Sequence, residues 1–442
     1  MTLHFSKYLL PPLIVITLLQ ALPAKVLAQP DDADDYYDNN YLRYDNHTYK
    51  DSIRSVLVHK EGWILTYPVI KLNSETGIVL EFDELGNEIN DYSYTIIHCD
   101  ANWKPSEISQ SEYIDGMYDE RIMDYAYSFN TFQEYIHYRV TIPNETMDIR
   151  ASGNYIIQIY EDYDREKLVL TRRFCVAEDK VVISAQIKRP SNLDRRDSGH
   201  EIDFTLNCSG VRMMNPFNDI KVVISQNGRW DNAITGLKPL IVNNNELMYD
   251  LEEGNVFDAG SEFRFFDIKS IRYQSERISR IVYEKPYYHV QLVPDEVRTF
   301  TVYFFNQDMN GKYFPEIQEG EDNSVEADYV WVYFTLPYEA PMIDGNFYVF
   351  GGLSDWLFNK SNRMIYNFEK KAYRSSMLLK QGYYNYEYAF VKDGSDCADI
   401  TFLEGSHYET ENDYIIYVYH RDLSERFDRL VGVEIINSLR GN

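Results

Sequence analysis

The chain of 442 residues contains 70 Asp and Glu against 43 Lys and Arg, so its formal net charge at pH 7 is −27. A surface this acidic repels nucleic acids and anionic lipid headgroups. We therefore expect no nucleic-acid partner, and either a soluble partner or a partner whose surface is neutral or basic. The length is sufficient for roughly two to four domains of 100–200 residues each.

The first residues have the features of a cleavable export signal. Lys7 supplies a positive charge, residues 9–22 are mostly apolar, and Val26-Leu27-Ala28 offers small or modest side chains to a signal peptidase. The apolar run is shorter than the ~20 residues of a membrane-spanning helix. An N-terminal anchor helix is the alternative. We predict a signal peptide over residues 1–28.

Residues 29–50 are acidic and rich in Tyr, with few aliphatic side chains to bury. This composition predicts a flexible arm before the first strand. The alternative is a docking tail, because aromatic residues spaced among acids can anchor on a partner.

From residue 52 onward the pattern indicates β-structure. Ile78, Leu80 and Phe82 alternate with other residues, which places every second side chain on one face of a sheet. The turn-forming residues 73–77 precede this run. The 39 Tyr, 23 Phe and 5 Trp favour pleated, half-buried surfaces. We predict an all-β protein of tandem β-sandwiches, Ig-like or early-set in type.

We predict three sandwiches, over residues 51–178, 179–338 and 339–442. The first junction follows the expected strand 168–176. The second coincides with a cluster of Pro337, Pro341 and Gly345.

The first sandwich contains a long stretch, residues 102–131, with no clear strand pattern. Such long loops are often functional, and the aromatic content of this one argues against disorder. Our hypothesis is that Trp103, Tyr113 and Phe129 bind a partner protein. The alternative is that these rings pack the loop onto its own sheet.

Four cysteines follow the signal segment: Cys99, Cys175, Cys208 and Cys397. They form no CxxC pair and have no metal-ligand spacing. An oxidising compartment permits disulfides, and Cys99 and Cys175 lie within one predicted domain. Free thiols buried on strands are the alternative.

The motifs that could carry chemistry have simpler explanations. His98 and Cys99 are adjacent in a strand pattern, so they point to opposite faces and cannot pair as base and nucleophile. Residues 308–313 begin like a calcium loop but lack the later ligands, and they contain Asn-Gly after an expected strand 299–305. We predict a tight turn there, and no catalytic site, cofactor or metal ion in the protein.

Residues 347–356 and 382–394 resemble the glycogen-binding, early-set β-sandwich domains. In that family a strand reaches an Asp/Asn-Trp corner and a later strand reads Tyr-x-Phe-x-x-Asp-Gly. Trp356 matches the first sugar-stacking aromatic residue. Ala389 stands where the family has a sugar-clamping lysine, and Asp396 where sugar binders often have Trp. The resemblance implies the sandwich, and leaves glycan binding as the alternative function.

Stretches along nearly all of the chain after the signal segment resemble the plug protein family of the type IX secretion system of Bacteroidetes, formerly a domain of unknown function. They are residues 98–103, 112–116, 128–131, 152–155, 171–174, 226–229, 262–264, 380–386 and 404–412. The resemblance implies a non-enzymatic periplasmic protein at the inner face of the outer membrane, peripheral to it through protein contacts only. Its partner would be the outer-membrane translocon barrel, whose inner mouth it caps when no substrate is engaged.

Overall fold

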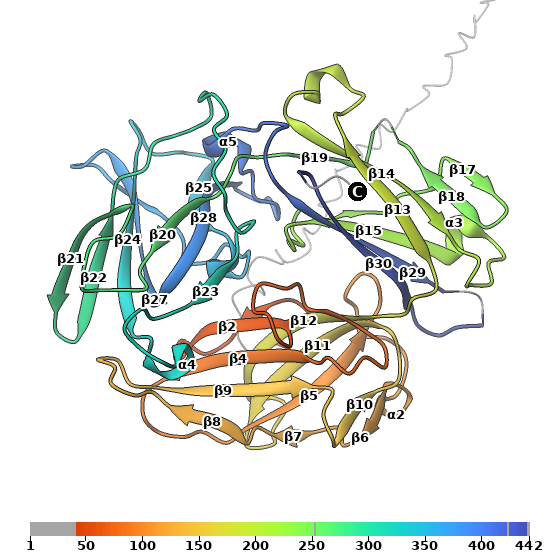
Figure 1. The fold of residues 1–442 in the computed structure, drawn as a ribbon, viewed down its shortest axis with the longest axis horizontal. Coiled ribbons are helices and arrows are strands. Elements are labelled where there is room, and N and C mark those ends of the chain that lie inside the picture. The colour runs from red at the N-terminus through yellow and green to blue at the C-terminus, as the bar shows by residue number, and fades with distance from the viewer. Residues whose placement is uncertain (1–40, 252, 422–423, 440–442) are drawn as a thin grey trace, which may run out of the picture. The chain divides into compact units, whose positions relative to one another are not determined.

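The computed structural model describes residues 41–251, 253–421 and 424–439, and strands dominate these residues (Figure 1). The predicted signal peptide and residues 29–40 of the predicted arm lie outside the described residues. In the described part of the chain the helices are single turns, so the prediction of an all-β fold is confirmed. Among the residues that the structure describes, no helix combines the length and apolarity that crossing a membrane requires.

The N-terminal sandwich packs two sheets against each other. One has the order β1-β12-β11-β5-β7, with β3 parallel to β12, and the other has the order β2-β4-β9-β8. Leu80 of β4 and Ile157 of β11 belong to the one core between these sheets. The elements are β1 (His47–Thr48), β2 (Ile53–Lys60), β3 (Val69–Lys71), β4 (Ile78–Leu85), β5 (Tyr92–Cys99), α2 (Gln110–Tyr113), β6 (Ile114–Gly116), β7 (Glu120–Arg121), β8 (Asp124–Tyr127), β9 (Tyr135–Ile142), β10 (Met147–Ile149), β11 (Gly153–Glu161) and β12 (Leu168–Ala177).

The middle sandwich combines two regions that are far apart in the sequence. One sheet has the order β13-β14-β18-β17, with β19 beside β14, and the other has the order β16-β15-β29-β30. Figure 1 shows the blue strands β29 and β30 beside the green strand β15. The elements are β13 (Val182–Lys188), η1 (Leu193–Arg195), β14 (Gly199–Asn207), α3 (Pro216–Asp219), β15 (Ile220–Gln226), β16 (Ile234–Thr235), β17 (Ile241–Asn243), β18 (Glu246–Tyr249), β19 (Val256–Asp258), β29 (Asp413–His420) and β30 (Arg429–Asn437).

The C-terminal sandwich lies between these two regions in the sequence. In one sheet β28 pairs with β20, β23 and β25, and the other sheet has the order β21-β22-β24-β27-β26. The elements are β20 (Arg264–Asp267), β21 (Ile278–Glu284), β22 (Tyr287–Leu292), β23 (Tyr313–Pro315), α4 (Asn323–Glu326), β24 (Tyr329–Pro337), β25 (Gly345–Phe350), η2 (Gly352–Ser354), β26 (Ile365–Asn367), β27 (Ala372–Lys380), β28 (Gly382–Lys392) and α5 (Thr401–Glu404).

The structure divides the second half of the chain differently from the predicted boundary at residue 338. Strands on both sides of that residue share one core, since Val290 and Val332 pack in the same cluster as Val349. Pro337 therefore ends a strand inside the C-terminal sandwich. The middle sandwich is instead completed by β29, whose Ile416 lies opposite Ile224 of β15. Such long-range pairing leaves no local pattern in the sequence.

Strands β11 and β29 are buried on both faces. Ile157 of β11 points into the N-terminal core, whereas Ile156 belongs to a second core that it shares with Ile415 of β29. On its other face β29 places Ile416 in the middle core. The N-terminal and middle sandwiches are thus joined sheet to sheet by a continuous apolar layer, which explains the near-continuous apolar runs of these strands.

Two predicted loops are more ordered than expected. Residues 42–50 belonged to the predicted flexible arm, but His47 and Thr48 pair with β12, and Tyr49 is buried. Residues 102–131 contain α2 and three short strands, β6 to β8. In both segments aromatic side chains supply the buried apolar area that the few aliphatic side chains do not supply.

A buried ion pair connects the N-terminal and C-terminal sandwiches. Lys380 Nζ of β27 donates to Asp83 Oδ2 of β4 at 2.6 Å, and the two side chains are only 2% and 1% exposed. Tyr329 OH donates to the same oxygen at 2.7 Å, and His137 lies 2.7 Å from the other. Burial alone raises the pKa of Asp83, but Lys380 and His137 outweigh it and lower the pKa below its ordinary value.

Candidate functional site

Trp103 is buried in the core between the N-terminal and middle sandwiches. Its ring lies edge-on to Trp230 with 4.9 Å between centroids, and the Arg173 guanidinium lies 4.4 Å from its centroid. Asp100 shapes the turn, since its Oδ1 accepts a hydrogen bond from the backbone N–H of Lys104 at 2.9 Å. The ring of Trp103 joins two sandwiches of this chain and is not presented to a partner.

Tyr113 ends α2 and lies in the core of the N-terminal sandwich. A capping box of Ser109 and Glu112 begins this single helical turn. Tyr113 OH donates to Ile96 O at 3.4 Å, and its ring centroid lies 5.7 Å from that of His98. Burial raises the pKa of the Tyr113 hydroxyl.

Phe129 is 68% exposed, directly after β8. Its backbone N–H donates to Val325 O at 2.8 Å, which holds the backbone at this residue. Of the three residues predicted to bind a partner, the structure therefore leaves one on the surface. Burial contradicts the hypothesis for Trp103 and Tyr113, and the three side chains do not form one surface.

The exposed ring of Phe129 instead continues a row of apolar side chains along β8. The members of this β8 strip are Met123, Tyr125, Tyr127 and Phe129, all exposed. β8 is the edge strand of its sheet, paired only with β9. The sequence signal for this strip is a period of two from residue 123 to residue 129, which places these side chains on one face of an extended chain.

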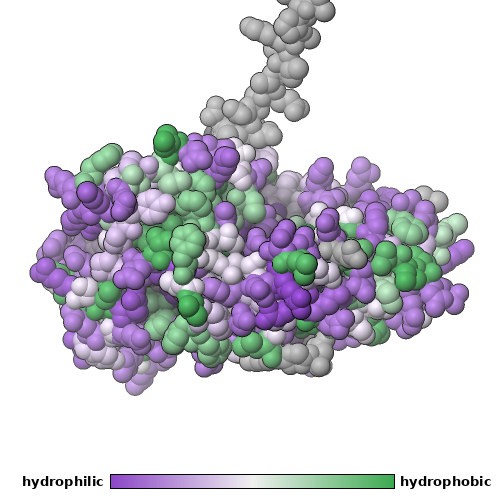
Figure 2. All heavy atoms as spheres, turned by 90° about the horizontal axis from the view of Figure 1, so that it is seen from above, coloured by the Kyte–Doolittle hydropathy of each residue, from purple (hydrophilic) through white to green (hydrophobic). Residues whose placement is uncertain are grey.

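The β8 strip has the properties of a contact surface. An aromatic side chain buries about 150–250 Å² in an interface and loses little conformational entropy. Figure 2 shows a different face, seen from above in the view of Figure 1, on which hydrophobic residues lie in patches among hydrophilic ones. An apolar row on an ordered edge strand differs from singly scattered residues, because a flat partner can cover several rings at once.

The His98-Cys99 motif lies on β5 with its side chains on opposite faces, as predicted. Burial lowers the pKa of His98 to about 4, and its ring nitrogens contact Ser106 Oγ at 2.8 Å and Ser152 O at 3.1 Å. Cys99 belongs to the core on the other face, and burial raises its pKa to about 12. This geometry does not provide an activated thiol.

All four cysteines are free thiols in the structure. Cys99 and Cys175 both lie opposite Asn154, one on each neighbouring strand of β11. A central strand therefore separates the two thiols. Cys208 is buried as well, and only Cys397 is exposed. The structure therefore has the free thiols of the alternative, and no disulfide joins Cys99 to Cys175.

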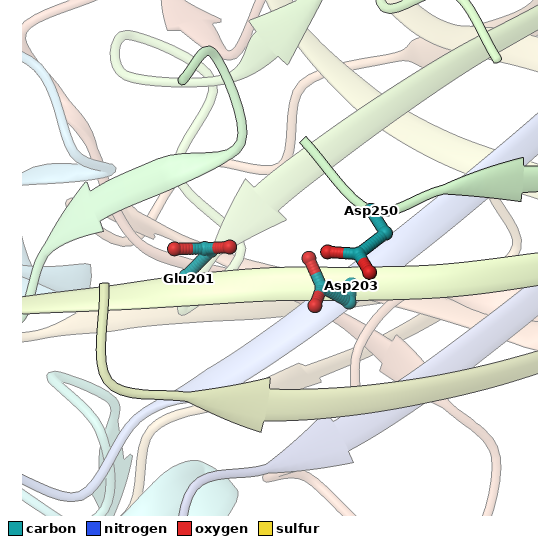
Figure 3. Close-up of side chains that lie close together, drawn as sticks. All are labelled: Glu201, Asp203 and Asp250. Carbon is teal, nitrogen blue, oxygen red and sulfur yellow. The ribbon is translucent and has the colours of Figure 1, made fainter. Parts of the chain in front are cut away.

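Three carboxylates of the middle sandwich lie close together, as Figure 3 shows: Glu201 and Asp203 on β14, and Asp250 just after β18. The ammonium group of Lys188 already pairs with all three, at 3.3 Å from Glu201 and 3.1 Å from Asp250. Hydrogen bonding to Lys188 lowers the pKa of Asp250, whereas burial raises the pKa of Asp203. The lysine supplies the positive charge that a metal ion would otherwise supply.

The calcium-like segment forms a tight turn, as predicted. Asn310 and Gly311 have φ values of 52° and 78°, and Lys312 N–H donates to Met309 O at 3.3 Å. The Asp308 carboxylate accepts hydrogen bonds from backbone N–H groups, including that of Asn310 at 2.7 Å, so its oxygens are occupied by the protein itself. Burial raises the pKa of Asp308 to about 7.

The residues of the early-set resemblance do not form an open sugar platform. Trp356 packs edge-on against Phe350 at 5.4 Å and Phe263 at 5.9 Å, with the Arg229 guanidinium 5.8 Å from its ring centroid. Ala389 is buried. The aromatic ring that a sugar would need is therefore used in packing.

A cavity of about 150 Å³ lies among residues of all three sandwiches. In its wall Arg172 donates to Asp355 Oδ2 at 2.9 Å, and the Lys312 ammonium lies 3.7 Å from the ring centroid of Tyr67. Tyr67 OH in turn donates to Asp413 Oδ2 at 2.9 Å. These contacts bridge the sandwiches, so the wall of the cavity serves to hold them together.

Comparison with known proteins adds the family to this geometry. The crystal structure of a hypothetical protein from Parabacteroides merdae ATCC 43184 is 34% identical in sequence and superimposes with a TM-score of 0.87. The match covers 90% of this chain and 100% of that one. A family model described as the first domain of the type 9 secretion system plug protein matches residues 53–178. The chain belongs to the type 9 secretion system plug protein family.

The matched region, residues 53–178, is the N-terminal sandwich that carries the β8 strip. The family assignment places the protein in a secretion-related setting. No curated protein matches the chain.

Proposed function

We propose that this protein is a non-enzymatic periplasmic plug, which closes the inner mouth of the type IX translocon barrel in the outer membrane when no substrate is engaged. The observation that carries the proposal is the match of residues 53–178 to the first domain of the plug family. A wide pore that stands empty leaks solutes, and a bound cap prevents this without any chemical step.

The architecture suits a rigid cap. The N-terminal and middle sandwiches share an apolar core, and the buried pair of Asp83 and Lys380 ties the N-terminal sandwich to the C-terminal one. A body that does not rearrange on binding loses less entropy, so more of the contact energy appears as affinity.

The contact that we propose for the barrel is the β8 strip. It replaces the predicted set of Trp103, Tyr113 and Phe129 and keeps Phe129. The acidic composition of the chain favours a neutral or basic rim on the partner and opposes contact with anionic headgroups. Attachment to the outer membrane then occurs through protein contacts alone.

The experiment measures recovery of the barrel with the tagged full-length protein from an outer-membrane extract of a bacterium that carries the system. The test variant replaces Tyr125, Tyr127 and Phe129 by Ser. Loss of three aromatic anchors predicts at least about a hundredfold weaker binding. If the wild-type protein recovers no barrel, the capping function is rejected.

A matched control replaces two other Tyr and one other Phe, all exposed and outside the strip: Tyr163, Tyr273 and Phe368. We expect this control to recover the barrel like the wild type. Equal loss in both triple variants would reject the β8 strip as the contact while leaving the capping function in place.

A further inference from the structure

Residues 299–305 have the sequence pattern of a strand, yet they pair with no strand in the structure. Between β22 and β23, residues 293–312 form no sheet pairing. The backbone N–H and C=O groups of residues 302–307 form no hydrogen bond with any residue that the structure describes. We call residues 300–307 the unpaired segment. Free backbone groups on strand-forming residues are the property of an open sheet edge.

The side chains of the unpaired segment are unusually exposed for their type. Phe300, Val302 and Phe304 are 97%, 90% and 81% exposed, while the intervening Tyr303 is half-buried. Val302 and Phe304 are two residues apart in a stretch without regular secondary structure, and they share a face where the chain is extended. Phe300 precedes them in a turn, in which Thr301 N–H donates to Arg298 O at 2.9 Å. Contiguous exposed apolar groups on an ordered protein mark an interaction site.

The unpaired segment is held in place by its own chain. Before it, Arg298 N–H donates to Leu403 O at 2.8 Å, and within it Tyr303 OH donates to Glu409 O at 3.0 Å. After it, the backbone N–H of Met309 donates to a side-chain oxygen of β28 at 2.6 Å. A strand that is fixed before binding loses less conformational entropy when a partner pairs with it.

The surroundings of Tyr303 are acidic. Its hydroxyl donates to Glu262 Oε1. Burial and the nearby charges of Glu262, Glu409 and Asp308 raise the pKa of that hydroxyl. The second oxygen of Glu262, Oε2, is buried and has no hydrogen-bond partner among the described residues. This environment accepts a basic side chain. It opposes pairing with a second copy of the chain, which would bring two such acidic groups together.

We propose that the unpaired segment is a docking strand, to which an extended segment of a partner protein, apolar at alternate positions and carrying Lys or Arg, adds through backbone hydrogen bonds. The inference rests on the proposed function for the identity of the partner, the periplasm-facing part of the barrel protein. It adds the place and the mode of contact.

The experiment uses single substitutions in the tagged full-length protein and measures barrel recovery. Val302, Phe304 and Phe305 are each changed to Pro and, in parallel, to Ala. Proline removes one N–H, and N–H groups of residues two apart point to the same edge. We therefore expect V302P and F304P to weaken binding by roughly fivefold to tenfold more than V302A and F304A. F305P and F305A should then differ little. If the partner pairs with the opposite edge, F305P instead weakens binding more than F305A, and the Pro and Ala variants at residues 302 and 304 differ little.

The outcomes separate the two proposals. If the wild type recovers the barrel and proline equals alanine at all three positions, strand addition is wrong while capping stands. If the wild type recovers no barrel, capping is wrong, and a peptide assay decides on the docking strand. A dimer of the wild type in analytical ultracentrifugation that V302P abolishes would identify a second copy as the occupant and overturn the proposal.

The peptide assay follows the fluorescence anisotropy of a labelled peptide of four Val-Lys repeats, with four Val-Glu repeats as its matched control. We expect the wild type to bind the lysine peptide at least about tenfold more tightly, and V302P or F305P, but not both, to lose that binding. Equal affinity for both peptides, or no binding of either, would overturn the docking strand.

Discussion

The β8 strip and the unpaired segment both expose rows of apolar side chains, but their backbones differ. β8 is paired with β9 and has one open edge, so its inner backbone groups are satisfied. Within the unpaired segment, the backbone groups of residues 302–307 form no hydrogen bond with any described residue. The comparison teaches that exposed aromatic rows can serve two kinds of contact. We propose that side chains carry most of the first contact, and that backbone hydrogen bonds add to the second.

The largest expected effect comes from removing the ion pair beneath the sheet of β8. Lys380→Met leaves the Asp83 carboxylate buried without its cation, so we expect the free energy of unfolding to fall by about 3–5 kcal/mol. Urea unfolding measures the loss. Lys370→Met, at an exposed turn, is the control and should stay within about 0.5 kcal/mol of the wild type. A loss of less than about 0.5 kcal/mol in both variants would show that the buried ion pair does not stabilise the fold.

A pH dependence distinguishes the region of the unpaired segment from that of β8. The folded-state pKa of Asp308, about 7, lies above the unfolded value. A carboxyl with a raised pKa contributes stability below its unfolded pKa and loses it as pH rises through the folded value. From this group we expect the free energy of unfolding to fall by up to about 4 kcal/mol between pH 4 and pH 7.5. Asp308→Asn should remove that part of the slope, and an unchanged slope would show that Asp308 is not the cause.

Proline tests the backbone difference directly. Ser128 N–H donates to Tyr135 O, so the alternation of the antiparallel ladder makes Ala126 and His137 a hydrogen-bonded pair. Ala126→Pro should lower the free energy of unfolding by about 1–2 kcal/mol. Val302→Pro breaks no internal bond and should stay within about 0.5 kcal/mol. Equal losses would mean that the unpaired segment has backbone partners after all.

The smallest effect concerns the side chains alone. Tyr125 lies 6.1 Å from Tyr138 between ring centroids, and Tyr125→Ser should lower the free energy of unfolding by about 0.5–1 kcal/mol. Phe304→Ser removes a ring that is free of such contacts, so thermal unfolding should be unchanged. A destabilised Phe304→Ser protein would show that the row is part of the fold and not a surface for a partner.

Local alternation was enough to predict the strands and the all-β class. Ile78, Leu80 and Phe82 are buried as expected. The pairing of β15 with β29 could not be predicted, because about 190 residues separate Ile224 from Ile416 and the order of strands in a sheet leaves no mark on either strand.

The candidate surface could be predicted only in part, because the sequence does not show which faces are covered by elements distant in the chain. Alternation shows that Tyr125, Tyr127 and Phe129 share a face, but not whether another element covers that face. Trp103 illustrates the reverse case, in which a loop residue is covered by the middle sandwich. The strand expected at residues 299–305 is not formed, because no segment among the described residues supplies a neighbouring strand.

The pairing of β15 with β29 also bears on how the chain becomes folded. The sheet that begins at residue 220 stays two strands short until residues 413–437 have been synthesised and delivered, while the C-terminal sandwich in between can already collapse. During that interval the apolar face of the N-terminal sheet that carries Ile156 lacks its cover. Such an exposed intermediate is prone to aggregation, so a chain stopped before residue 413 should depend on chaperones for its survival.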